Sequence, residues 1–147
     1  MQRRQRSRRN ITDEEREKIR EFFRSYPEVA AVYLFGSYGT EFQLPTSDID
    51  LGIIFAHPTE LRDELEIDAD LALHLHTDKV DFVNLARAPL GLQHRALKEG
   101  ELLCENNPIA HSDFIENVLR QYEDYRIYQR KFMHEYRASL KEAYGDG

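Results

Sequence analysis

The chain has 147 residues, of which 41% are hydrophobic and 32% charged, which is typical of one globular domain. The longest apolar run, LGIIFA, is far too short to cross a bilayer, so we expect no membrane association. Cys104 is the one cysteine, which excludes a disulfide within the chain and favours a cytoplasmic location. It follows two leucines, and we predict a small buried residue rather than a nucleophile.

The formal net charge of −7 is unevenly distributed along the chain. Residues 1–10 carry five arginines and no acid, which leaves −12 on residues 11–147. Duplex nucleic acid binds mainly through neutralisation of its phosphates by basic residues, so residues 11–147 are too acidic to be a good surface for it. We therefore expect no specific nucleic-acid binding. We predict that residues 1–10 form a disordered basic tail, with contact to RNA or an acidic partner as the alternative.

The first third of the chain contains one expected helix and two expected strands. Thr12 and Glu15 form a capping box that opens a helix over residues 12–26, with one apolar stripe and Pro27 at its end. Two short stretches rich in β-branched and aromatic residues are typical of buried strands, at residues 30–36 and 47–55. Pro45 and its polar neighbours place the loop between them at the surface.

The remaining two thirds alternate between helix and strand patterns. A helix over residues 59–77 has an apolar face that we assign to Leu61, Leu65, Ala69, Ala72 and Leu73. The later elements are expected as a strand at 80–85, a helix at 90–98 closed by Gly100, a short strand at 101–105 and a helix at 112–144. This order predicts an α+β fold of the α/β class: one mixed sheet with packed helices and a long C-terminal helix. We assign residues 11–107 to the domain body and 108–147 to a helix of the same domain that can serve as a partner interface.

Asp48 and Asp50 are the first candidates for chemistry. They lie two residues apart on an expected strand, so both side chains leave the same face with Cα atoms about 6.6 Å apart. Two adjacent carboxylates repel each other unless a cation lies between them. Carboxylate oxygens favour Mg²⁺ or Mn²⁺, and a pair of such ions is the usual device for in-line displacement at phosphorus.

Asp81 and the Gly36-Ser37 pair complete the candidate site. Asp81 lies in the expected strand VDFVNL, where aspartate is unusual, and three carboxylates would converge if this strand neighbours the one with Asp50. The alternative for Asp81 is a solvent-exposed residue on an edge strand. Gly36 ends a strand and lets the backbone approach a phosphate, while the Ser37 hydroxyl and nearby N–H groups can donate to its oxygens.

Other well-known motifs do not fit these residues. The chain lacks the Gly-Lys-Ser/Thr of a P-loop. Phe35 stands where a G-x-S-x-G nucleophile elbow needs glycine. Asp48-x-Asp50-x-Gly52 lacks the third acidic ligand and the glycine spacing of a calcium-binding EF-hand.

Gly36-Ser37, a ten-residue gap, Asp48-Ile-Asp50 and a later strand Asp81 resemble the signature of the polymerase-β-type nucleotidyltransferases. The short chain resembles their minimal members, the MNT proteins. The stretch DFVNLARAPLGLQHRALKEGELL, followed by a tyrosine-rich helix, is similar to MntA-type antitoxins of HEPN/MNT toxin–antitoxin pairs.

The resemblance implies a polymerase-β-like fold and transfer of AMP from ATP to a hydroxyl. In the antitoxin branch the acceptor is a tyrosine of a HEPN toxin, an RNase that the AMP silences, so a hetero-complex is implied. Asp48 and Asp50 would then hold two Mg²⁺ ions, and Asp81 would bind the ion near the acceptor and help remove its proton. Gly36 and Ser37 would hold the β- and γ-phosphates.

Two other functions remain open at this level. One is a nucleotidyltransferase that modifies a small hydroxylated molecule of the aminoglycoside type, which suits the acidic body but would need a cleft for which no second domain is evident. The other is a non-enzymatic antitoxin that blocks its partner sterically. The C-terminal helix carries the aromatic residues for a partner surface. Alternatively, about half of these rings pack on the domain itself. They are Tyr122, Tyr125, Tyr128, Phe132, Tyr136 and Tyr144.

Overall fold

The computed structural model describes residues 11–35, 49–77 and 80–144. The predicted tail at residues 1–10 therefore lies outside the described residues. In chain order the elements are α1 (Asp13–Arg24), β1 (Val29–Phe35), β2 (Ile49–Phe55), α2 (Leu61–Leu75), β3 (Val80–Asn84), the 3₁₀ turn η2 (Leu85–Arg87), α3 (Leu90–Glu99), β4 (Glu101–Glu105) and α4 (Pro108–Tyr144). Each predicted helix and strand that falls in the described residues is present, with bounds shifted by a few residues.

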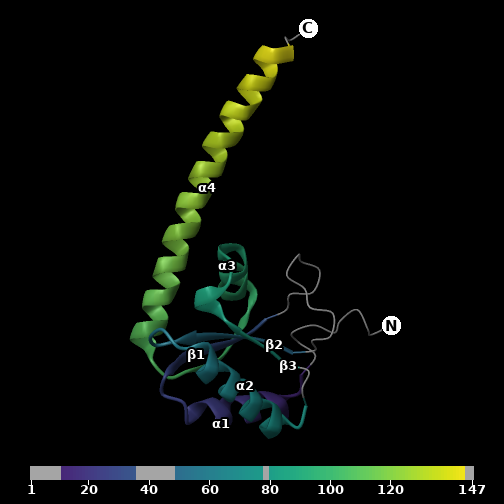
Figure 1. Ribbon diagram of the computed structural model, residues 1–147, viewed down its shortest axis with the longest axis vertical. Helices are drawn as coiled ribbons and strands as arrows, with labels where there is room; N and C mark the ends of the chain where they lie inside the picture. Colours follow the sequence, from purple (N-terminus) through teal and green to yellow (C-terminus); the bar gives the residue numbers. More distant parts are fainter. Residues whose placement is uncertain (1–10, 36–48, 78–79, 145–147) are drawn as a thin grey trace, which may run out of the picture.

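The strands form one mixed sheet in the order β3-β2-β1-β4. β1 pairs antiparallel with both β2 and β4, whereas β2 and β3 run parallel. The helices α1 and α2 cover one face of this sheet and α3 covers the other, as Figure 1 shows. The predicted fold class is thereby confirmed.

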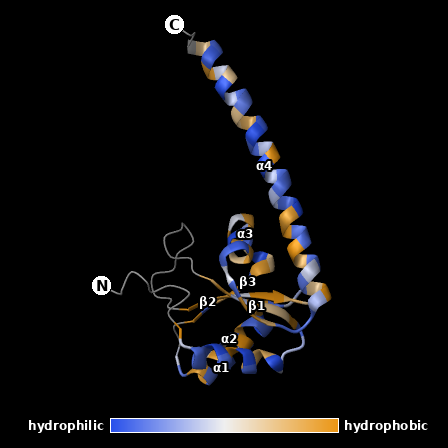
Figure 2. Ribbon diagram, turned by 180° about the vertical axis from the view of Figure 1, so that it is seen from behind, coloured by the Kyte–Doolittle hydropathy of each residue, from blue (hydrophilic) through white to orange (hydrophobic). Residues whose placement is uncertain are grey.

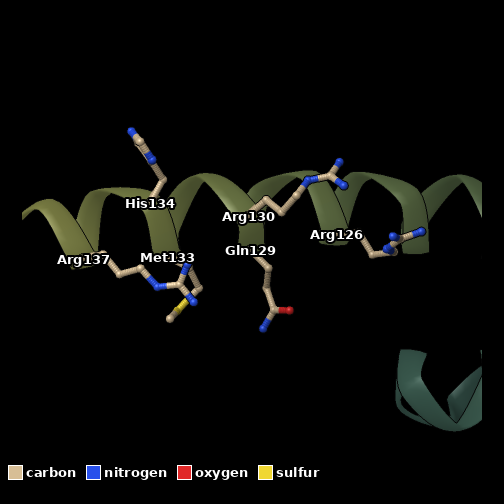
Figure 3. Close-up of a pocket in the computed structure, with 6 residues that line it drawn as sticks. All are labelled: Arg126, Gln129, Arg130, Met133, His134 and Arg137. Atoms are coloured by element: carbon tan, nitrogen blue, oxygen red, sulfur yellow. The ribbon is translucent and has the colours of Figure 1, made fainter.

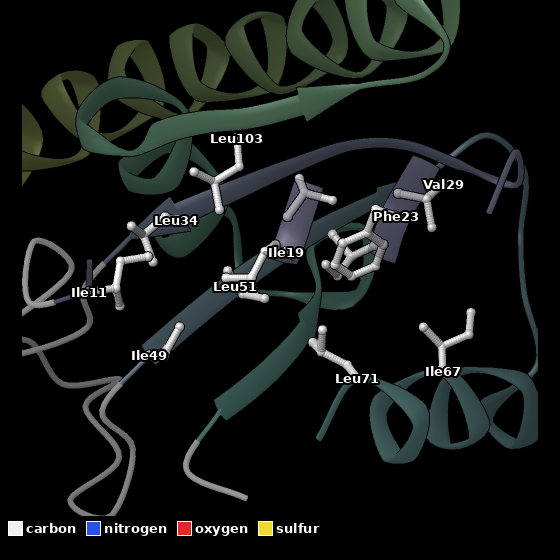
Figure 4. Packing of buried hydrophobic residues seen from close by; sticks show 12 residues of the cluster. Ile11, Ile19, Phe23, Val29, Leu34, Ile49, Leu51, Ile67, Leu71 and Leu103 are labelled. Atoms are coloured by element: carbon white, nitrogen blue, oxygen red, sulfur yellow. The ribbon is translucent and has the colours of Figure 1, made fainter. Parts of the chain in front are cut away.

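Each sheet face has its own apolar core because successive side chains of a strand point to opposite faces. Alternate residues of β2, including Leu51 and Ile53, pack with α1 and α2, and Figure 4 shows this first core cluster. Ile54 and the β1 residues Tyr33 and Phe35 belong to the second core cluster, which α3 covers. The central strands are therefore buried on both sides.

α1 begins with the predicted capping box. The Thr12 hydroxyl accepts from the Glu15 backbone N–H at 3.0 Å, and the Glu15 carboxylate accepts from the Thr12 N–H at 2.9 Å. Its apolar stripe buries Ile19 and Phe23 completely. The helix ends at Arg24, before Pro27.

The apolar face assigned to α2 was wrong. Leu61, Leu65 and Leu73 are exposed, and the buried residues of the helix are Glu64, Ile67 and Leu71. Apolar residues occur on both sides of this helix, so their spacing alone could not distinguish the two. The core-facing side includes a carboxylate, Glu64, which is tolerated there because it pairs with Arg87 at 2.6 Å and accepts from Asn84 at 2.8 Å.

Gly100 closes α3 as predicted, but not through a left-handed backbone, since its φ is −79°. A Cβ at this position would lie 2.3 Å from the Ala96 carbonyl oxygen. The glycine is needed because the chain passes against the last turn of the helix.

α4 begins at Pro108, earlier than predicted, and its first turns are fastened to the sheet. His111, which is buried, lies 2.6 Å by its Nδ1 from a Glu105 carboxylate oxygen and 2.8 Å by its Nε2 from the Tyr33 hydroxyl. A carboxylate only accepts, so Nδ1–H donates to Glu105 and, in a singly protonated ring, Nε2 accepts from Tyr33. These bonds join α4 to β1 and β4.

Beyond this attachment α4 leaves the domain. Its 37 residues span about 55 Å, and Figures 1 and 2 show the C-terminal half projecting away from the rest of the chain. Tyr122 packs on α3, where its ring stacks on His94 with centroids 3.6 Å apart. Four rings further along the helix are exposed: Tyr125, Tyr128, Phe132 and Tyr136. None of the helices that the structure describes is long and apolar enough to span a membrane.

Candidate active site

Asp50 and Asp81 meet at the start of the parallel strand pair. They are register partners on β2 and β3, each the second residue of its strand. Neighbouring strands lie about 4.8 Å apart, and register partners project to the same face, so the two carboxylates lie side by side. The predicted convergence of these two aspartates is present in the structure.

The two carboxylates share the sheet face with the second core cluster. Asp50 is two residues before Gly52 and is the register partner of Phe35, the last residue of β1. This face is the one that α3 covers, whereas Ile49 and Leu51 belong to the opposite core. The candidate site thus lies on the α3 side, where the polar ends of β2 and β3 replace apolar packing.

The surroundings of Asp81 disfavour the charged form of its carboxyl group. Burial, together with the smaller effects of the Asp50 and Asp68 charges, raises the pKa of Asp81 from its ordinary 3.8 to about 6. Burial also raises the pKa of Asp68. Asp81 is thus a partly buried acid on an edge strand, not the fully exposed residue of the alternative interpretation.

Asp68 was missed by sequence reasoning. It lies on α2, next in sequence to the buried Ile67, and its charge acts on Asp81. The available signal was an acidic residue at the margin of a buried helix face. That signal was hidden because the apolar face of α2 was assigned to the wrong side.

Gly52, two residues after Asp50 on β2, lacks a side chain where another segment packs closely against the strand. A Cβ at Gly52 would lie 2.9 Å from Leu85 Cδ1, in the turn that follows β3. Leu85 is completely buried and belongs to the second core cluster. The glycine therefore lets the segment after β3 pack closely over β2, which holds the strands of Asp50 and Asp81 together.

Three of the predicted site residues, Gly36, Ser37 and Asp48, lie outside the described residues. The ends that flank their segment, Phe35 and Ile49, are on adjacent strands beside Asp50. The roles assigned to these three residues remain predictions.

Among the described residues, the carboxylates of Asp50 and Asp81 are donors that suit a hard divalent cation. Two adjacent carboxylates, one with a raised pKa, gain stability when a cation lies between them. The part of the chain that the structure describes holds no cluster of three or more metal-ligating side chains. Asp50 and Asp81 could supply two ligands to such a cation, and a third would have to come from Asp48 or the substrate.

Cys104 on β4 does not take part in this site. It is partly covered and packs against the first core cluster, and burial raises the pKa of its thiol. A raised pKa leaves less of the reactive thiolate, which agrees with the predicted structural role.

Comparisons with known proteins extend this picture. Residues 17–109 match the family described as polymerase beta, nucleotidyltransferase. No curated protein matches the chain.

Solved structures share the fold across nearly their whole length. A toxin–antitoxin complex named MntA–HepT matches with a TM-score of 0.62 and 22% identity, covering 84% of this chain and 97% of the other. A tri-AMPylated Shewanella oneidensis HEPN toxin in complex with MNT antitoxin gives a TM-score of 0.62 at 21% identity, covering 85% and 98%. A toxin–antitoxin structure with AMP-PNP matches with a TM-score of 0.60 and 25% identity, covering 82% of this chain and 96% of the other.

The family match covers well over half of the chain, including β1, β2 and β3 and both described acids. The fold, the parallel pairing of Asp50 with Asp81 and the match over residues 17–109 agree with one another. The chain belongs to the polymerase beta nucleotidyltransferase family.

Proposed function

We propose that this nucleotidyltransferase is an antitoxin that transfers AMP from ATP to a hydroxyl, a tyrosine in our proposal, of a cognate HEPN RNase toxin and thereby silences it. The observation that carries the proposal is the side-by-side placement of Asp50 and Asp81. A tri-AMPylated toxin bound to an MNT antitoxin of the same fold supports the reaction, and an AMP-PNP complex of another relative supports ATP as donor. The proposal includes a hetero-complex with the toxin and a cytoplasmic location.

In the proposed reaction the acceptor oxygen attacks the α-phosphorus of ATP. The bond from that phosphorus to the bridging oxygen breaks, and pyrophosphate leaves. Asp81 lies on the edge strand β3, beside Asp50 on the same sheet face, and would take the proton of the acceptor hydroxyl. Gly36 and Ser37 would hold the β- and γ-phosphates as pyrophosphate departs.

Asp48, Asp50 and Asp81 would hold Mg²⁺, two ions in our proposal, with Mn²⁺ as a substitute. A free tyrosine hydroxyl has a pKa near 10 and is a poor nucleophile at neutral pH. Bound magnesium would make the hydroxyl easier to deprotonate and would neutralise charge on the leaving group. Asp50 and Asp81 contribute by holding the carboxylate oxygens in fixed register on two hydrogen-bonded strands.

Intact-mass spectrometry of a HEPN protein co-expressed with this chain tests the proposal. The HEPN protein is co-expressed with the wild type or with the Asp50→Asn/Asp81→Asn variant. Mass increments of AMP units that depend on the two aspartates support the proposal. Exposed Asp113→Asn, on α4, is the matched control and leaves the increments unchanged.

An unmodified HEPN protein that stays bound and silent would contradict the proposal and favour the steric antitoxin. AMP transfer to a small polyhydroxylated amine but not to the HEPN protein would favour the aminoglycoside-type enzyme.

A further inference from the structure

The projecting part of α4 continues a helix face that packs against the domain lower down. Val118, Tyr125 and Phe132 follow one another at intervals of seven residues, as do Tyr122 and Tyr136 with Gln129 between them. Seven residues are almost two full turns, so each row runs along one side of the helix. Val118 is completely buried and Tyr122 stacks on His94 of α3, so the face is defined by packing at its lower end.

The upper end of the same face is exposed. We call it the distal stripe and define it as Tyr125, Phe132, Met133, Tyr136 and Leu140, all of which are exposed. The rings of Phe132 and Tyr136 stack on each other at 6.2 Å. A sustained apolar face of this kind is typical of a helix that packs against another protein surface.

Basic residues accompany the distal stripe. Residues 126–141 contain Arg126, Arg130, Lys131, Arg137 and Lys141 and one acid, Glu135, a formal net of +4 in a chain whose total is −7. Figure 3 shows Arg126, Arg130 and Arg137 spread along this length of α4 with Met133 among them. All the labelled residues come from one helix, so this surface is the convex side of a helix rather than an enclosed cavity.

We infer that the distal stripe docks the acceptor protein through an apolar groove flanked by acidic residues. The inference rests on the proposed function, because it assigns this surface to the protein that receives AMP. The stripe supplies the apolar contact, and the arginines beside it select acidic flanks by charge complementarity. Tyrosine, phenylalanine, methionine and arginine are the residues enriched in such interfaces.

The position of the stripe relative to the acids supports a role in presenting the acceptor. Tyr122 begins one of its rows and stacks on α3, so the stripe faces the side of α4 on which α3 lies. α3 in turn covers the sheet face of Asp50 and Asp81. A partner docked on the stripe therefore lies on the side of the sheet that carries Asp50 and Asp81, and Figure 1 shows α3 and the projecting part of α4 on that side, away from α1 and α2.

Two other occupants fit these features of α4 less well. Pairing with a second copy of this helix would place two segments of net +4 against each other, which charge repulsion opposes. Single-stranded RNA would suit aromatic rings interleaved with arginines, but here Phe132 and Tyr136 stack on each other along one side of the helix, as an apolar groove requires.

The test compares variants of the distal stripe with control variants at other exposed positions of α4. Phe132→Ala/Tyr136→Ala removes two side chains that are 53% and 50% exposed, so folding is not at risk. Ile127→Ala is the matched control, since Ile127 is 49% exposed on the side of α4 away from the stripe. Arg130→Glu/Arg137→Glu reverses charge beside the stripe, and Arg120→Glu does so away from it.

The probe is the HEPN protein that receives AMP in the test of the proposed function. The readouts are its dissociation constant, its KM and kcat as AMP acceptor, and ATP binding to the free enzyme. We expect the stripe variant to weaken HEPN binding and raise its KM by at least about tenfold, with ATP binding unchanged. We expect the charge reversal to slow association and to reduce its dependence on salt. Both controls should stay within about twofold of the wild type.

The possible failures are distinguishable. Wild-type affinity and KM in the stripe variant, with AMP still transferred, would overturn the docking surface and leave the proposed function intact. Stripe-dependent binding without AMP transfer would overturn the proposed function and retain the surface as a binding site for that protein. Loss of self-association, or of RNA binding, in place of HEPN binding would overturn the inference in favour of a second copy or of RNA.

Discussion

Asp50 and Asp81 are register partners on parallel strands, so two acids far apart in the sequence lie side by side on one face of the sheet. A pair of like charges in this position opposes folding unless something compensates for it. Burial is the main cause of the raised pKa of Asp81, and the charge of Asp50 adds to it in the same direction.

Asp81→Asn should stabilise the metal-free protein at neutral pH. The pKa of Asp81 is about 6 in the folded chain against 3.8 as its ordinary value, so the folded state binds the proton more tightly. Ionised Asp81 therefore lowers the free energy of unfolding as pH rises from about 4 to 6, and the penalty persists above pH 6. The full shift corresponds to about 3 kcal/mol, and solvent screening of this partly exposed group reduces our expectation to about 1 kcal/mol.

Chemical denaturation with a chelator present, at pH 3.5 and pH 7.5, checks this expectation. The gain in unfolding free energy should appear at pH 7.5 and largely vanish at pH 3.5, where Asp81 is mostly protonated in both states. Asp113→Asn removes one negative charge elsewhere and should show no such pH dependence. A destabilised Asp81→Asn at pH 7.5 would mean that the carboxylate is compensated by contacts within the chain.

Magnesium should make the wild type more stable than Asp81→Asn, the reverse of the order expected without metal. Because a cation between the carboxylates removes their repulsion, adding Mg²⁺ in the millimolar range should raise the melting temperature of the wild type more than that of Asp81→Asn. Calcium, which prefers more ligands and longer distances, should have a smaller effect. Equal shifts for both proteins would place the cation elsewhere.

The helices, the strands and the two site residues Asp50 and Asp81 could be predicted because the sequence patterns that indicate them lie within short stretches of the chain. Thr12 and Glu15 specify a helix start, and a strand requires an apolar run with turn residues at its ends. The pairing of Asp50 with Asp81 followed from the family resemblance and from the rarity of aspartate in a strand. Strand order, by contrast, depends on contacts between distant segments and was left open.

The buried face of α2 could not be predicted because its outcome depends on a partner outside the helix. Glu64 lies on the buried side only because its carboxylate is satisfied by Arg87 and Asn84, both distant in sequence, and by Thr59, just before the helix. A rule that places leucines inside and glutamates outside selects the opposite side. The attachment of α4 through His111 was missed for the same reason, since its partners come from two other elements.

Gly52→Ala should destabilise the protein, while Gly91→Ala should not. A Cβ at Gly52 meets the buried Leu85 side chain at 2.9 Å, so the turn after β3 must shift, at an expected cost of about 1–3 kcal/mol. At Gly91, inside α3, nothing lies within 4 Å, and alanine should add roughly 0.5 kcal/mol through its helix propensity. Urea denaturation of the two variants measures both, and equal effects would show that Leu85 yields without cost.

Glu64→Ala should cost about 1–3 kcal/mol of unfolding free energy. The Glu64 side chain is 7% exposed and accepts hydrogen bonds from Asn84 and Thr59 besides its ion pair with Arg87. Its removal leaves the Asn84 amide without its closest acceptor. Glu66→Ala, an exposed residue of the same helix, should change stability by less than about 0.5 kcal/mol and serves as control. A loss no greater than that of the control would mean that water replaces the carboxylate.

His111→Ala should loosen the attachment of α4. The Tyr33 hydroxyl, buried and 2.8 Å from His111 Nε2, would lose its partner, and Glu105 would lose the Nδ1–H that lies 2.6 Å away. We expect a loss of about 2–4 kcal/mol from these bonds and from the cavity.

Hydrogen exchange should show where the loss acts, because opening of the first turns of α4 exposes their amides. His134→Ala, on the exposed part of the same helix, should change neither stability nor exchange near Pro108. If α4 in fact depends on Val118 and on Tyr122 stacked against His94, exchange at its start will stay slow in His111→Ala and the loss will be spread over the sheet.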